Sequence, residues 1–442
     1  MRFFDRKNEI EKLRKIEELS YKVAQFTVIS GRRRIGKTSL VQQAYDKKQW
    51  IYLFVARKSE SELCDSFVES ISEATNITMP KGTKHFAELF RFLMELAETR
   101  HLTVMIDEFQ DFNRVNPSIF SEMQNIWDSH KNRAKINLIV CGSVNSLINK
   151  IFRDDKEPLY GRHTEMLTLH PFTPSTLKEI MQEYKPDYTA DDLLALYMTT
   201  GGVAKYVELF VDWGCLTRKE MLDRYFQKDS YFLGEGKGML IEEFGRDYGT
   251  YFSILSLIAQ GHNTRSVIEE MLGVQISGYI KNLTEDYGLI VKRQPLMEKS
   301  SNKNVHYFLN DEFLRFWFRY VFKYSYMTES GANQKLREIV ERDYTTYSGR
   351  VLENWFVETL IEQGEYTRIG YWHDRKGENE IDIIAADELN DKVMFCDVKR
   401  QADNIDIPIL KTKAETFMKS THSFSKYEIE YKGLSLDDLF IR

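Results

Sequence analysis

The sequence is poor in cysteine and has no long hydrophobic run. Its 442 residues include only four cysteines, and these are widely spaced: Cys64, Cys141, Cys215 and Cys396. With no CxxC pair, the sequence argues against a zinc site or a disulfide framework and favours a reducing, cytoplasmic location. No apolar run reaches the roughly 18 residues of a membrane-spanning helix, so we expect no membrane contact. The charged N-terminus, MRFFDRKNEIEKLRKIEEL, also lacks the apolar centre of a signal peptide.

The chain has no excess of positive charge. Its formal net charge is −6, so the whole molecule is not a basic coat for nucleic acid, and any DNA contact must be local. Apolar residues make up 42% of the chain and charged residues 29%, which is typical of a globular protein. At about 100–200 residues per domain, the length predicts two to four domains.

Four apolar segments in the first 160 residues are expected to be strands. They cover residues 25–30, 50–56, 101–109 and 136–143, and helical stretches lie between them. Apolar strands that alternate with helices predict an α/β fold whose parallel sheet is covered on both faces. Residues 171–245 are expected to be mostly helical.

The segment ISGRRRIGKTSL, residues 29–40, carries the most specific motif. Gly31, Gly36, Lys37 and Thr38 fit the pattern GxxxxGKT, between a strand and a helix, as a phosphate-binding loop requires. Glycines let the backbone N–H groups point at the phosphates, and the helix N-terminus adds its positive dipole end. Lys37 is expected to reach the β and γ phosphates of ATP, and Thr38 to hold Mg²⁺. The alternative is a glycine turn without a ligand. The expected ATP-binding residues of the loop are Gly31, Arg32, Arg33, Arg34, Ile35, Gly36, Lys37, Thr38 and Ser39.

Polar residues at the ends of two later strands extend this site. Asp107 and Glu108 follow LTVMI; in P-loop NTPases such an acid holds Mg²⁺ and a following glutamate polarises the attacking water. The alternative interpretation of Asp107 and Glu108 is a helix N-cap at the end of a strand. Ser143 is expected to sense the γ-phosphate, with an ordinary N-cap serine as the alternative. Arg162 could be an arginine finger, for its own ATP or for a neighbour's in a homo-oligomer, or a plain surface arginine.

Residues 248–325 have the pattern of a winged helix, with three short helices followed by two strands. The third helix, residues 275–290, would enter the major groove of DNA. Residues 250–325 hold nine Lys and Arg against seven Asp and Glu, a thin supply for phosphate contacts. DNA binding and an interdomain lever are therefore equal alternatives. The residues offered to DNA are Gln275, Ser277, Tyr279, Lys281, Asn282, Lys292, Arg293, Lys299 and Lys303.

A second group of acids lies near the C-terminus. Asp382 lies in NEIDIIA, and Asp397 and Lys399 lie in FCDVKR. Because side chains alternate along a strand, Asp397 and Lys399 point the same way, and Asp382 joins them if the two strands pair. Glu353, on the preceding helix, could face the cluster. Carboxylates with a lysine suit a divalent metal, at Asp382 and Asp397, and phosphodiester hydrolysis.

Segments spread over the chain resemble the archaeal-type ATPase family, a P-loop group related to STAND and AAA+ proteins. The matching segments are FFDRKNEIEKL, GRRRIGKTSL, VMIDEFQ, LIVCGS, PLYGRHTEMLTLHPF and TGGVAKY. The resemblance implies that the three arginines are a family feature beside the phosphates, and that a helical lid follows the ATPase core. The chain departs from the family at Ala204, where the family usually carries proline.

The C-terminal acids resemble the PD-(D/E)xK nuclease superfamily, and more narrowly the C-terminal domain of unknown function that accompanies archaeal-type ATPases. This resemblance implies a restriction-endonuclease-like α/β domain. A charged strand end with the nuclease activity lost is the alternative. Residues 350–442 hold 19 Asp and Glu against 13 Lys and Arg, which suits a metal better than DNA phosphate. The expected domains are a P-loop core (1–170), a helical lid (171–245), a winged helix (246–330) and a nuclease-like domain (331–442).

Three functions follow from these patterns. The first is a Mg²⁺-dependent ATPase that controls a DNA-binding and DNA-cleaving remainder. The second is a STAND-type nucleotide switch whose C-terminal tail recruits partners. The third is a DNA-binding regulator for which ATP is only a ligand. Asp107 and Glu108 argue against the third, since a pure binder needs no acid to polarise water.

Overall fold

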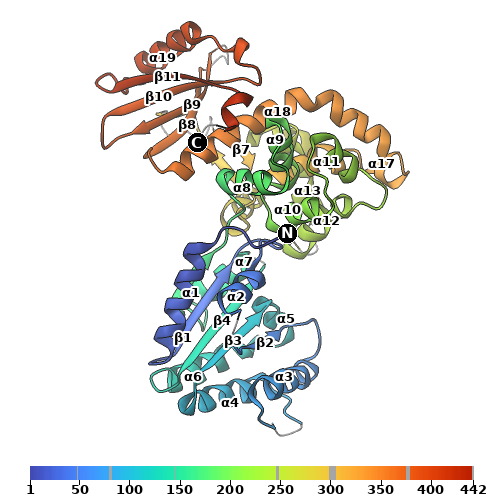
Figure 1. Ribbon diagram of the computed structural model, residues 1–442, viewed down its shortest axis with the longest axis vertical. Coiled ribbons are helices and arrows are strands. Elements are labelled where there is room, and N and C mark those ends of the chain that lie inside the picture. Colours follow the sequence, from blue (N-terminus) through green and yellow to red (C-terminus); the bar gives the residue numbers. More distant parts are fainter. Residues whose placement is uncertain are drawn as a thin grey trace. The chain divides into compact units, whose positions relative to one another are not determined.

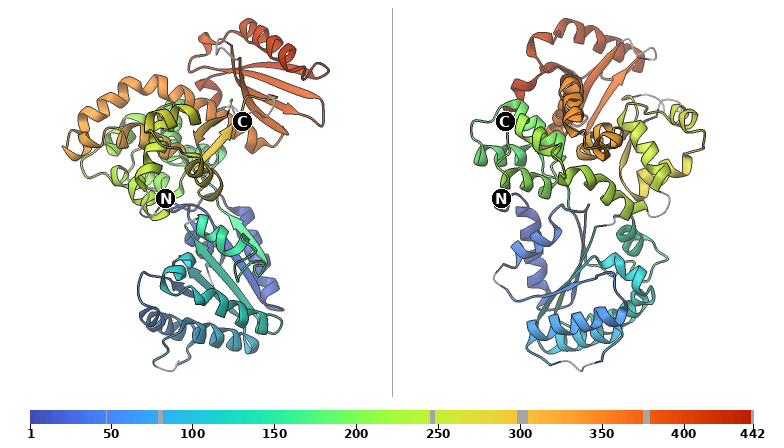
Figure 2. Two further views of the ribbon diagram at one scale, coloured as in Figure 1. Left: turned by 180° about the vertical axis from the view of Figure 1, so that it is seen from behind. Right: turned by 90° about the vertical axis from the view of Figure 1, so that its right-hand side faces the viewer.

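The computed structural model describes residues 1–46, 48–78, 82–143, 145–244, 248–297, 305–374 and 379–440. The chain divides into two compact units, Arg2–His170 and Pro171–Arg442, and Met1 packs with the second. Figure 1 and Figure 2 show the first unit in blue to teal and the second in green to red. The lid, winged-helix and nuclease-like segments all belong to the second unit, and their bounds stay a prediction.

The first unit is built on a five-stranded sheet in the order β2-β3-β4-β1-β5. Its strands are β1 (Gln25–Ser30), β2 (Ile51–Phe54), β3 (Leu102–Asp107), β4 (Ile136–Gly142) and β5 (Glu165–Thr168). All neighbouring strands are parallel, and every residue of β1, β3 and β4 is buried. The predicted parallel sheet is thus confirmed, and β5 is an additional edge strand that the sequence did not reveal.

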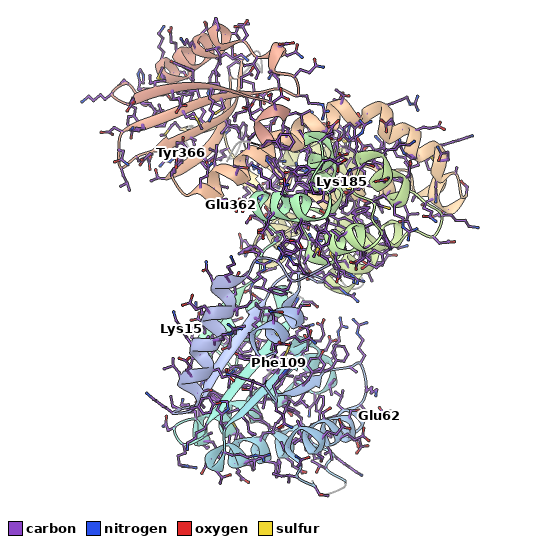
Figure 3. All side chains as sticks on the ribbon, in the orientation of Figure 1. Lys15, Glu62, Phe109, Lys185, Glu362 and Tyr366 are labelled. Atoms are coloured by element: carbon purple, nitrogen blue, oxygen red, sulfur yellow. The ribbon has the colours of Figure 1, made fainter. Side chains whose placement is uncertain are left out.

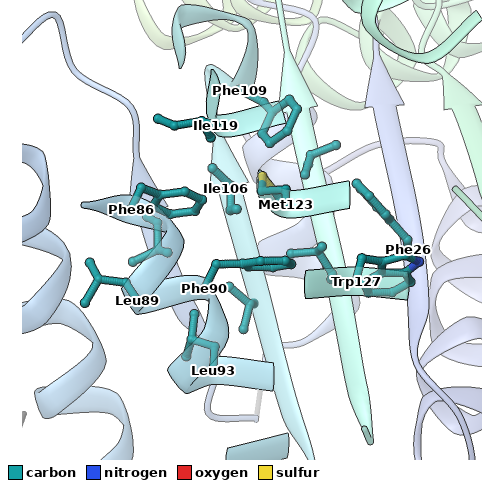
Figure 4. Packing of buried hydrophobic residues seen from close by; sticks show 14 of the residues in the cluster. Phe26, Phe86, Leu89, Phe90, Leu93, Ile106, Phe109, Ile119, Met123 and Trp127 are labelled. Carbon is teal, nitrogen blue, oxygen red and sulfur yellow. The ribbon is translucent and has the colours of Figure 1, made fainter. Parts of the chain in front are cut away.

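Helices cover both faces of this sheet. They are α1 (Lys7–Ser20), α2 (Lys37–Ala44), α3 (Glu60–Thr75), α4 (Phe86–Thr99), α5 (Phe112–Val115), α6 (Ser118–His130) and α7 (Asn145–Arg153). One buried cluster joins α1 and α2 to one face, through residues such as Leu13, Leu40 and Ile139. The other, larger cluster joins α3, α4 and α6 to the opposite face and includes Phe90 and Trp127 (Figure 4).

Charge patterning matches this layering. Lys15 and Glu62 are exposed on the outer sides of α1 and α3, whereas Phe109 is fully buried, as Figure 3 shows. Burying the aromatic side chains of this core contributes roughly 1.5–3 kcal/mol each. The sheet that carries the phosphate-binding loop is therefore a rigid platform.

The second unit begins with helices α8 (Pro174–Tyr184), α9 (Ala190–Thr200), α10 (Ala204–Asp212), α11 (Arg218–Tyr225) and α12 (Tyr231–Phe244). Gly202 forms the turn before α10 with a φ of 69°, and a Cβ there would lie 2.5 Å from the Phe172 carbonyl oxygen. Ala204 is the first residue of α10, a position that favours proline because its N–H needs no helical partner.

Three further helices and a hairpin follow in the predicted order. They are α13 (Tyr248–Ala259), α14 (Arg265–Leu272), α15 (Ser277–Lys281, continued to Asp286 by a π-helical turn), β6 (Ile290–Arg293) and β7 (His306–Leu309). Ile276, Ile280 and Leu283 are buried, so the apolar face of this third helix packs against the rest of the unit. Lys299 and Lys303 of the predicted wing lie outside the described residues. After β7 come α16 (Glu312–Phe316), a π-helical segment (Trp317–Phe322) and α17 (Ser325–Glu329).

The chain ends in a mixed four-stranded sheet with the order β11-β10-β9-β8. A long helix, α18 (Asn333–Gln363), precedes β8 (Arg368–His373), β9 (Glu380–Asp387), β10 (Lys392–Val398), α19 (Ile407–Thr421) and β11 (Glu428–Leu434). Strands β9 and β10 are antiparallel, and β10 and β11 are parallel. Together with the N-terminal sheet, this α/β segment confirms the predicted fold class.

Within the described residues, no helix is long and apolar enough to cross a membrane.

Candidate functional site

The phosphate-binding loop joins β1 to α2. Gly31 has a φ of 146° and Gly36 one of 94°, and Arg34 between them also adopts positive φ, at 69°. A Cβ at Gly31 would lie 2.8 Å from the carbonyl oxygen of Leu169. Glycine is therefore required at both ends of the loop, by backbone conformation and, at Gly31, by space as well.

Two side chains hold the loop in place. Ile35 is 1% exposed and packs in the core beneath α2. Lys37, also buried, donates hydrogen bonds from Nζ to the carbonyl oxygens of Gly31 (2.8 Å) and Arg32 (3.1 Å). The ammonium group of Lys37 thus lies over the mouth of the loop, where a phosphate group would meet it.

Thr38 and Asp107 meet at the end of the sheet. The Thr38 hydroxyl donates to Asp107 Oδ2 at 2.8 Å, and the Tyr52 hydroxyl donates to the same oxygen at 3.0 Å. Hydroxyl and carboxylate oxygens are the donors that Mg²⁺ prefers. These residues therefore fit a Mg²⁺ ion bound beside the phosphates.

Glu108 follows Asp107 with a φ of 53°, a conformation that turns its side chain away from the strand direction. Its Oε2 accepts hydrogen bonds from Ser143 Oγ at 2.7 Å and from Gln110 Nε2 at 2.5 Å. Two neutral donors fix the carboxylate and leave it able to take a proton from water.

Strand order explains why Ser143 reaches Glu108. Strand β4 lies between β1, which leads into the phosphate loop, and β3, which leads into Asp107. Because carboxyl ends of parallel strands meet at one edge, Ser143 lies between the loop and the acids. The structure thus brings together Lys37, Thr38, Asp107, Glu108 and Ser143.

Arg162 lies at the opposite end of the strands from the phosphate loop. It precedes β5, whose Glu165 pairs with Thr27 near the start of β1, so it lies at the amino ends of the strands. Its guanidinium bonds to Asp128 Oδ2 (3.2 Å) and to the Tyr160 carbonyl oxygen (2.9 Å). Arg162 therefore lies at the opposite end of the strands from the phosphate loop of its own unit, and an arginine finger acting on its own ATP stays a prediction. Action on a neighbouring molecule stays a prediction.

The C-terminal acids lie on neighbouring strands, as the sequence predicted if those strands paired. The β9–β10 register pairs Ile383 with Cys396, which places Asp382 next to Asp397. Lys399 Nζ lies 2.8 Å from Asp397 Oδ1 and 3.3 Å from Asp382 Oδ2. The Val398 N–H also donates to Asp382 Oδ2 at 2.7 Å. The lysine therefore bridges the two carboxylates.

Burial sets the protonation of this cluster. Burial, and then the carboxylates of Asp382 and Glu380, raise the pKa of Glu353 to about 8. Burial also raises the pKa of Asp382, although the Val398 N–H and Lys399 oppose the rise. Glu353 on α18 is thus electrostatically coupled to the acids of β9, and at neutral pH it carries a proton that it can donate.

A metal ion was expected at Asp382 and Asp397, the two carboxylates that Lys399 bridges. No group of three or more His, Cys, Asp and Glu side chains with metal-binding geometry occurs among the residues that the structure describes. Two carboxylates can hold Mg²⁺ when substrate phosphate and water complete its shell. The second metal therefore stays a prediction.

The third helix of the 248–325 segment presents a polar surface. Gln275, Ser277 and Lys281 are exposed, and Lys292 on β6 is exposed too. Arg293 is only half-exposed, and it lines a cavity of the unit. The supply of cations for DNA phosphate is smaller than the sequence suggested.

Sequence reasoning missed Tyr52 and Gln110. Gln110 stands two residues after Glu108, so its proximity could have been inferred from the motif. Tyr52 comes from β2, and only the strand order, which places β2 beside β3, brings its hydroxyl to Asp107.

Two family models and several known proteins match this chain. A family model described as an ATPase domain predominantly from Archaea matches residues 3–210, and one described as archaea bacterial proteins of unknown function matches residues 317–414. The uncharacterized protein MJECL04 of Methanocaldococcus jannaschii is 30% identical over 428 residues, covering 95% of this chain and 92% of that protein.

Another uncharacterized protein of the same organism, MJ0424, is 30% identical over 87 residues, 18% of this chain and 84% of that protein. Among solved structures, the Walker-type ATPase PABY2304 of Pyrococcus abyssi is 23% identical with a TM-score of 0.55. The alignment covers 72% of this chain and 96% of that one. This likeness shows a shared fold.

Proposed function

Because this chain belongs to the archaeal-type ATPase family, we propose that it hydrolyses ATP with Mg²⁺ and that Glu108 is the general base. The observation that carries the proposal is the carboxylate of Glu108, fixed by Ser143 and Gln110 beside the Thr38–Asp107 pair. A protein that only bound ATP would need no such base.

In the proposed reaction, Glu108 takes a proton from water as the water oxygen attacks the γ-phosphorus. The bond from that phosphorus to the β–γ bridging oxygen breaks, and ADP leaves. Lys37 and the backbone N–H groups of the loop neutralise charge on the phosphates. When bound, Mg²⁺ would polarise the phosphate oxygens beside Thr38 and Asp107.

Phosphate release from ATP tests this proposal. Purified protein should release phosphate in Mg²⁺, and excess EDTA should stop it. Glu108→Gln should bind ATP and hydrolyse it at least roughly 100-fold more slowly, whereas the exposed control Glu95→Gln on α4 should behave as wild type. Hydrolysis by Glu108→Gln at the wild-type rate would remove Glu108 as the base.

A second function, metal-dependent cleavage of DNA, is favoured by the Asp382–Lys399–Asp397 bridge. Lys399 can orient a water for attack on phosphorus and stabilise the charge that develops, and the carboxylates can hold a metal. DNA would bind through the 248–325 segment. The competing proposal is a nucleotide switch, in which this cluster is a remnant or a surface that recruits partners.

Incubation with linear, circular and single-stranded DNA separates the two proposals. Each reaction would contain Mg²⁺ or Mn²⁺, with and without ATP. Cleavage that Asp382→Asn abolishes, and that the control Asp391→Asn in the β9–β10 turn retains, supports a nuclease. Absence of cleavage in every condition, with intact ATPase activity, supports the switch.

A further inference from the structure

The second unit contains a polar cavity of about 350 Å³ that neither proposed activity uses directly. It lies among α13, the β6–β7 hairpin, α18 and β8. Its wall is rich in basic side chains: Arg293, Arg315, Arg319, Arg350, His306 and His373. Cavities from about 300 Å³ upward hold small ligands, so this one has room for a phosphorylated group the size of a nucleotide.

Among the described residues, two of the four arginines of the wall form ion pairs, and two do not. Arg315 is paired with Glu312 at 2.9 Å and Arg319 with Asp343 at 2.8 Å. By contrast, within the described ranges neither Arg293 nor Arg350 has a carboxylate within 4 Å, the distance of an ion pair. The guanidinium groups of Arg293 and Arg350 can therefore form an ion pair with an anionic ligand.

Arg293 is the more unusual of the two. Its Nη1 donates only a long hydrogen bond, 3.4 Å, to Asn354 Oδ1, and its guanidinium lies 5.3 Å from the centroid of the Phe308 ring. Burial, and then repulsion from Arg315, lower the pKa of Arg293. The Glu312 carboxylate, which is itself paired with Arg315, opposes this shift only in part. Keeping a cation away from water with so little compensation costs free energy, which an anionic ligand would recover.

The cavity also has two fixed imidazole rings. His306 Nδ1 lies 3.0 Å from Asn263 Oδ1, and His373 Nδ1 lies 3.0 Å from the Asp374 carbonyl oxygen. The ring centroids are 5.5 Å apart. Arg350, which is exposed, stands with one guanidinium nitrogen 3.7 Å from where a Cβ of Gly261 would be. Half-buried arginines and the exposed Arg350 thus line the cavity together with the two imidazole rings.

Planar guanidinium groups match phosphate oxygens in pairs, which makes arginine the preferred side chain for this anion. We propose that the cavity binds the phosphate group of a ligand through Arg293 and Arg350. The site is separate from the ATP loop, which lies in the other unit. Glu353 lines the cavity and is coupled to Asp382, so a bound phosphate would lie beside the C-terminal acids.

The phosphate could belong to the end of a nucleic acid strand or to a free nucleotide. The binding proposal does not rest on the proposed cleavage, since a phosphate can bind here whether or not the acids hydrolyse DNA. It also does not rest on ATP hydrolysis. Binding measurements can therefore fail or succeed independently of both activities.

The test uses the full chain carrying Lys37→Ala, so that the ATP loop contributes little to phosphate binding. Fluorescence anisotropy with a short labelled oligonucleotide, with and without a 5′-phosphate, measures binding of a phosphorylated strand end. Competition by pyrophosphate and by adenosine monophosphate measures the free ligands. Preference for the 5′-phosphorylated strand over the competitors assigns the site to strand ends, and the reverse preference assigns it to a nucleotide.

Arg350→Ala should weaken binding of the preferred probe roughly 10- to 100-fold, since a charge-assisted hydrogen bond is lost. Arg342→Ala, exposed on the same helix and outside the cavity wall, should change it less than about 2-fold. Arg293→Lys keeps the positive charge but loses the planar guanidinium group that can donate two hydrogen bonds to one phosphate, so it should also weaken binding. Circular dichroism should show that this variant is folded. Absence of phosphate-dependent binding, or binding that both Arg350→Ala and Arg293→Lys retain, would overturn the proposal.

Discussion

The two acidic sites of this chain use similar residues in different surroundings. At the N-terminal site, Lys37 donates to backbone carbonyl oxygens and Glu108 accepts hydrogen bonds from two neutral side chains. At the C-terminal site, Lys399 is paired with Asp397 and Asp382, and Glu353 holds a proton. In the second site the lysine and the carboxylates thus bond to one another, whereas the hydrogen bonds described above for the first site join Lys37 and Glu108 to neutral groups. The first therefore supports the stronger functional proposal.

The largest expected effect is at Lys37. Lys37→Ala should reduce ATP hydrolysis by at least roughly 100-fold. Lys37 is the first residue of α2, and its ammonium group is the charge expected to stabilise the phosphates during hydrolysis. Phosphate release at saturating ATP measures it, with the exposed Lys22→Ala as the control. Normal turnover in Lys37→Ala would show that ATP does not bind at this loop. The difference inferred between the N-terminal and C-terminal sites would then be wrong.

A smaller loss is expected at Ser143. Ser143→Ala removes one of the two donors to Glu108 and should slow hydrolysis by roughly 10-fold, with little change in ATP binding, since about 1–2 kcal/mol of positioning is lost. Comparison of kcat with the Kd for ATP checks this. An unchanged kcat would mean that Gln110 alone positions the carboxylate.

The pH dependence of stability examines the C-terminal site. Because the folded pKa of Glu353 is raised to about 8, the folded state keeps a proton that the unfolded chain loses above about pH 4.3. Stability is therefore lost as pH rises from there to about 8. Glu353→Gln cannot ionise, so it should gain on the order of 4 kcal/mol relative to wild type between pH 5 and pH 8.5.

Thermal or urea unfolding of both proteins at the two pH values measures that difference. The exposed Glu365→Gln, next to the end of the same helix, serves as the control and should show no pH-dependent gain. Equal pH dependence of Glu353→Gln and wild type would show that the carboxyl is ionised in the folded protein and that the two sites are more alike than we infer.

The smallest expected effect is at Tyr52. Tyr52→Phe removes the hydroxyl that donates to Asp107 at 3.0 Å and leaves the Thr38 hydrogen bond in place. We expect the Mg²⁺ concentration needed for half-maximal hydrolysis to change by about 2- to 5-fold, as for one hydrogen bond. A change of more than a hundredfold would make Tyr52 part of the metal site itself.

The sequence was most informative where one segment contains the whole motif. The loop from Gly31 to Thr38 needs only a strand, a turn and a helix, and all three are local. Asp107 and Glu108 could be read from a strand end in the same way. Ser143 was expected at this site, but its hydrogen bond to Glu108 was not. Tyr52 was missed, because its hydroxyl reaches Asp107 through the order of the strands, which periodicity does not encode.

Residues separated along the chain were harder to place. Arg162 stands close in sequence to β5, and only the parallel pairing of β5 with β1 shows that it lies at the far edge of the sheet. The C-terminal acids were expected together if two strands paired, and the register brings them together. The raised pKa of Glu353 depends on tertiary burial, which no local pattern could have predicted.

The central claim is that the N-terminal unit hydrolyses ATP and does so through Glu108. The most direct measurement is a single-turnover reaction of prebound ATP, comparing wild type, Glu108→Gln and Glu95→Gln. We predict that all three bind ATP, that wild type and Glu95→Gln release phosphate, and that Glu108→Gln retains intact ATP. Release of phosphate by Glu108→Gln at the wild-type rate would contradict the claim.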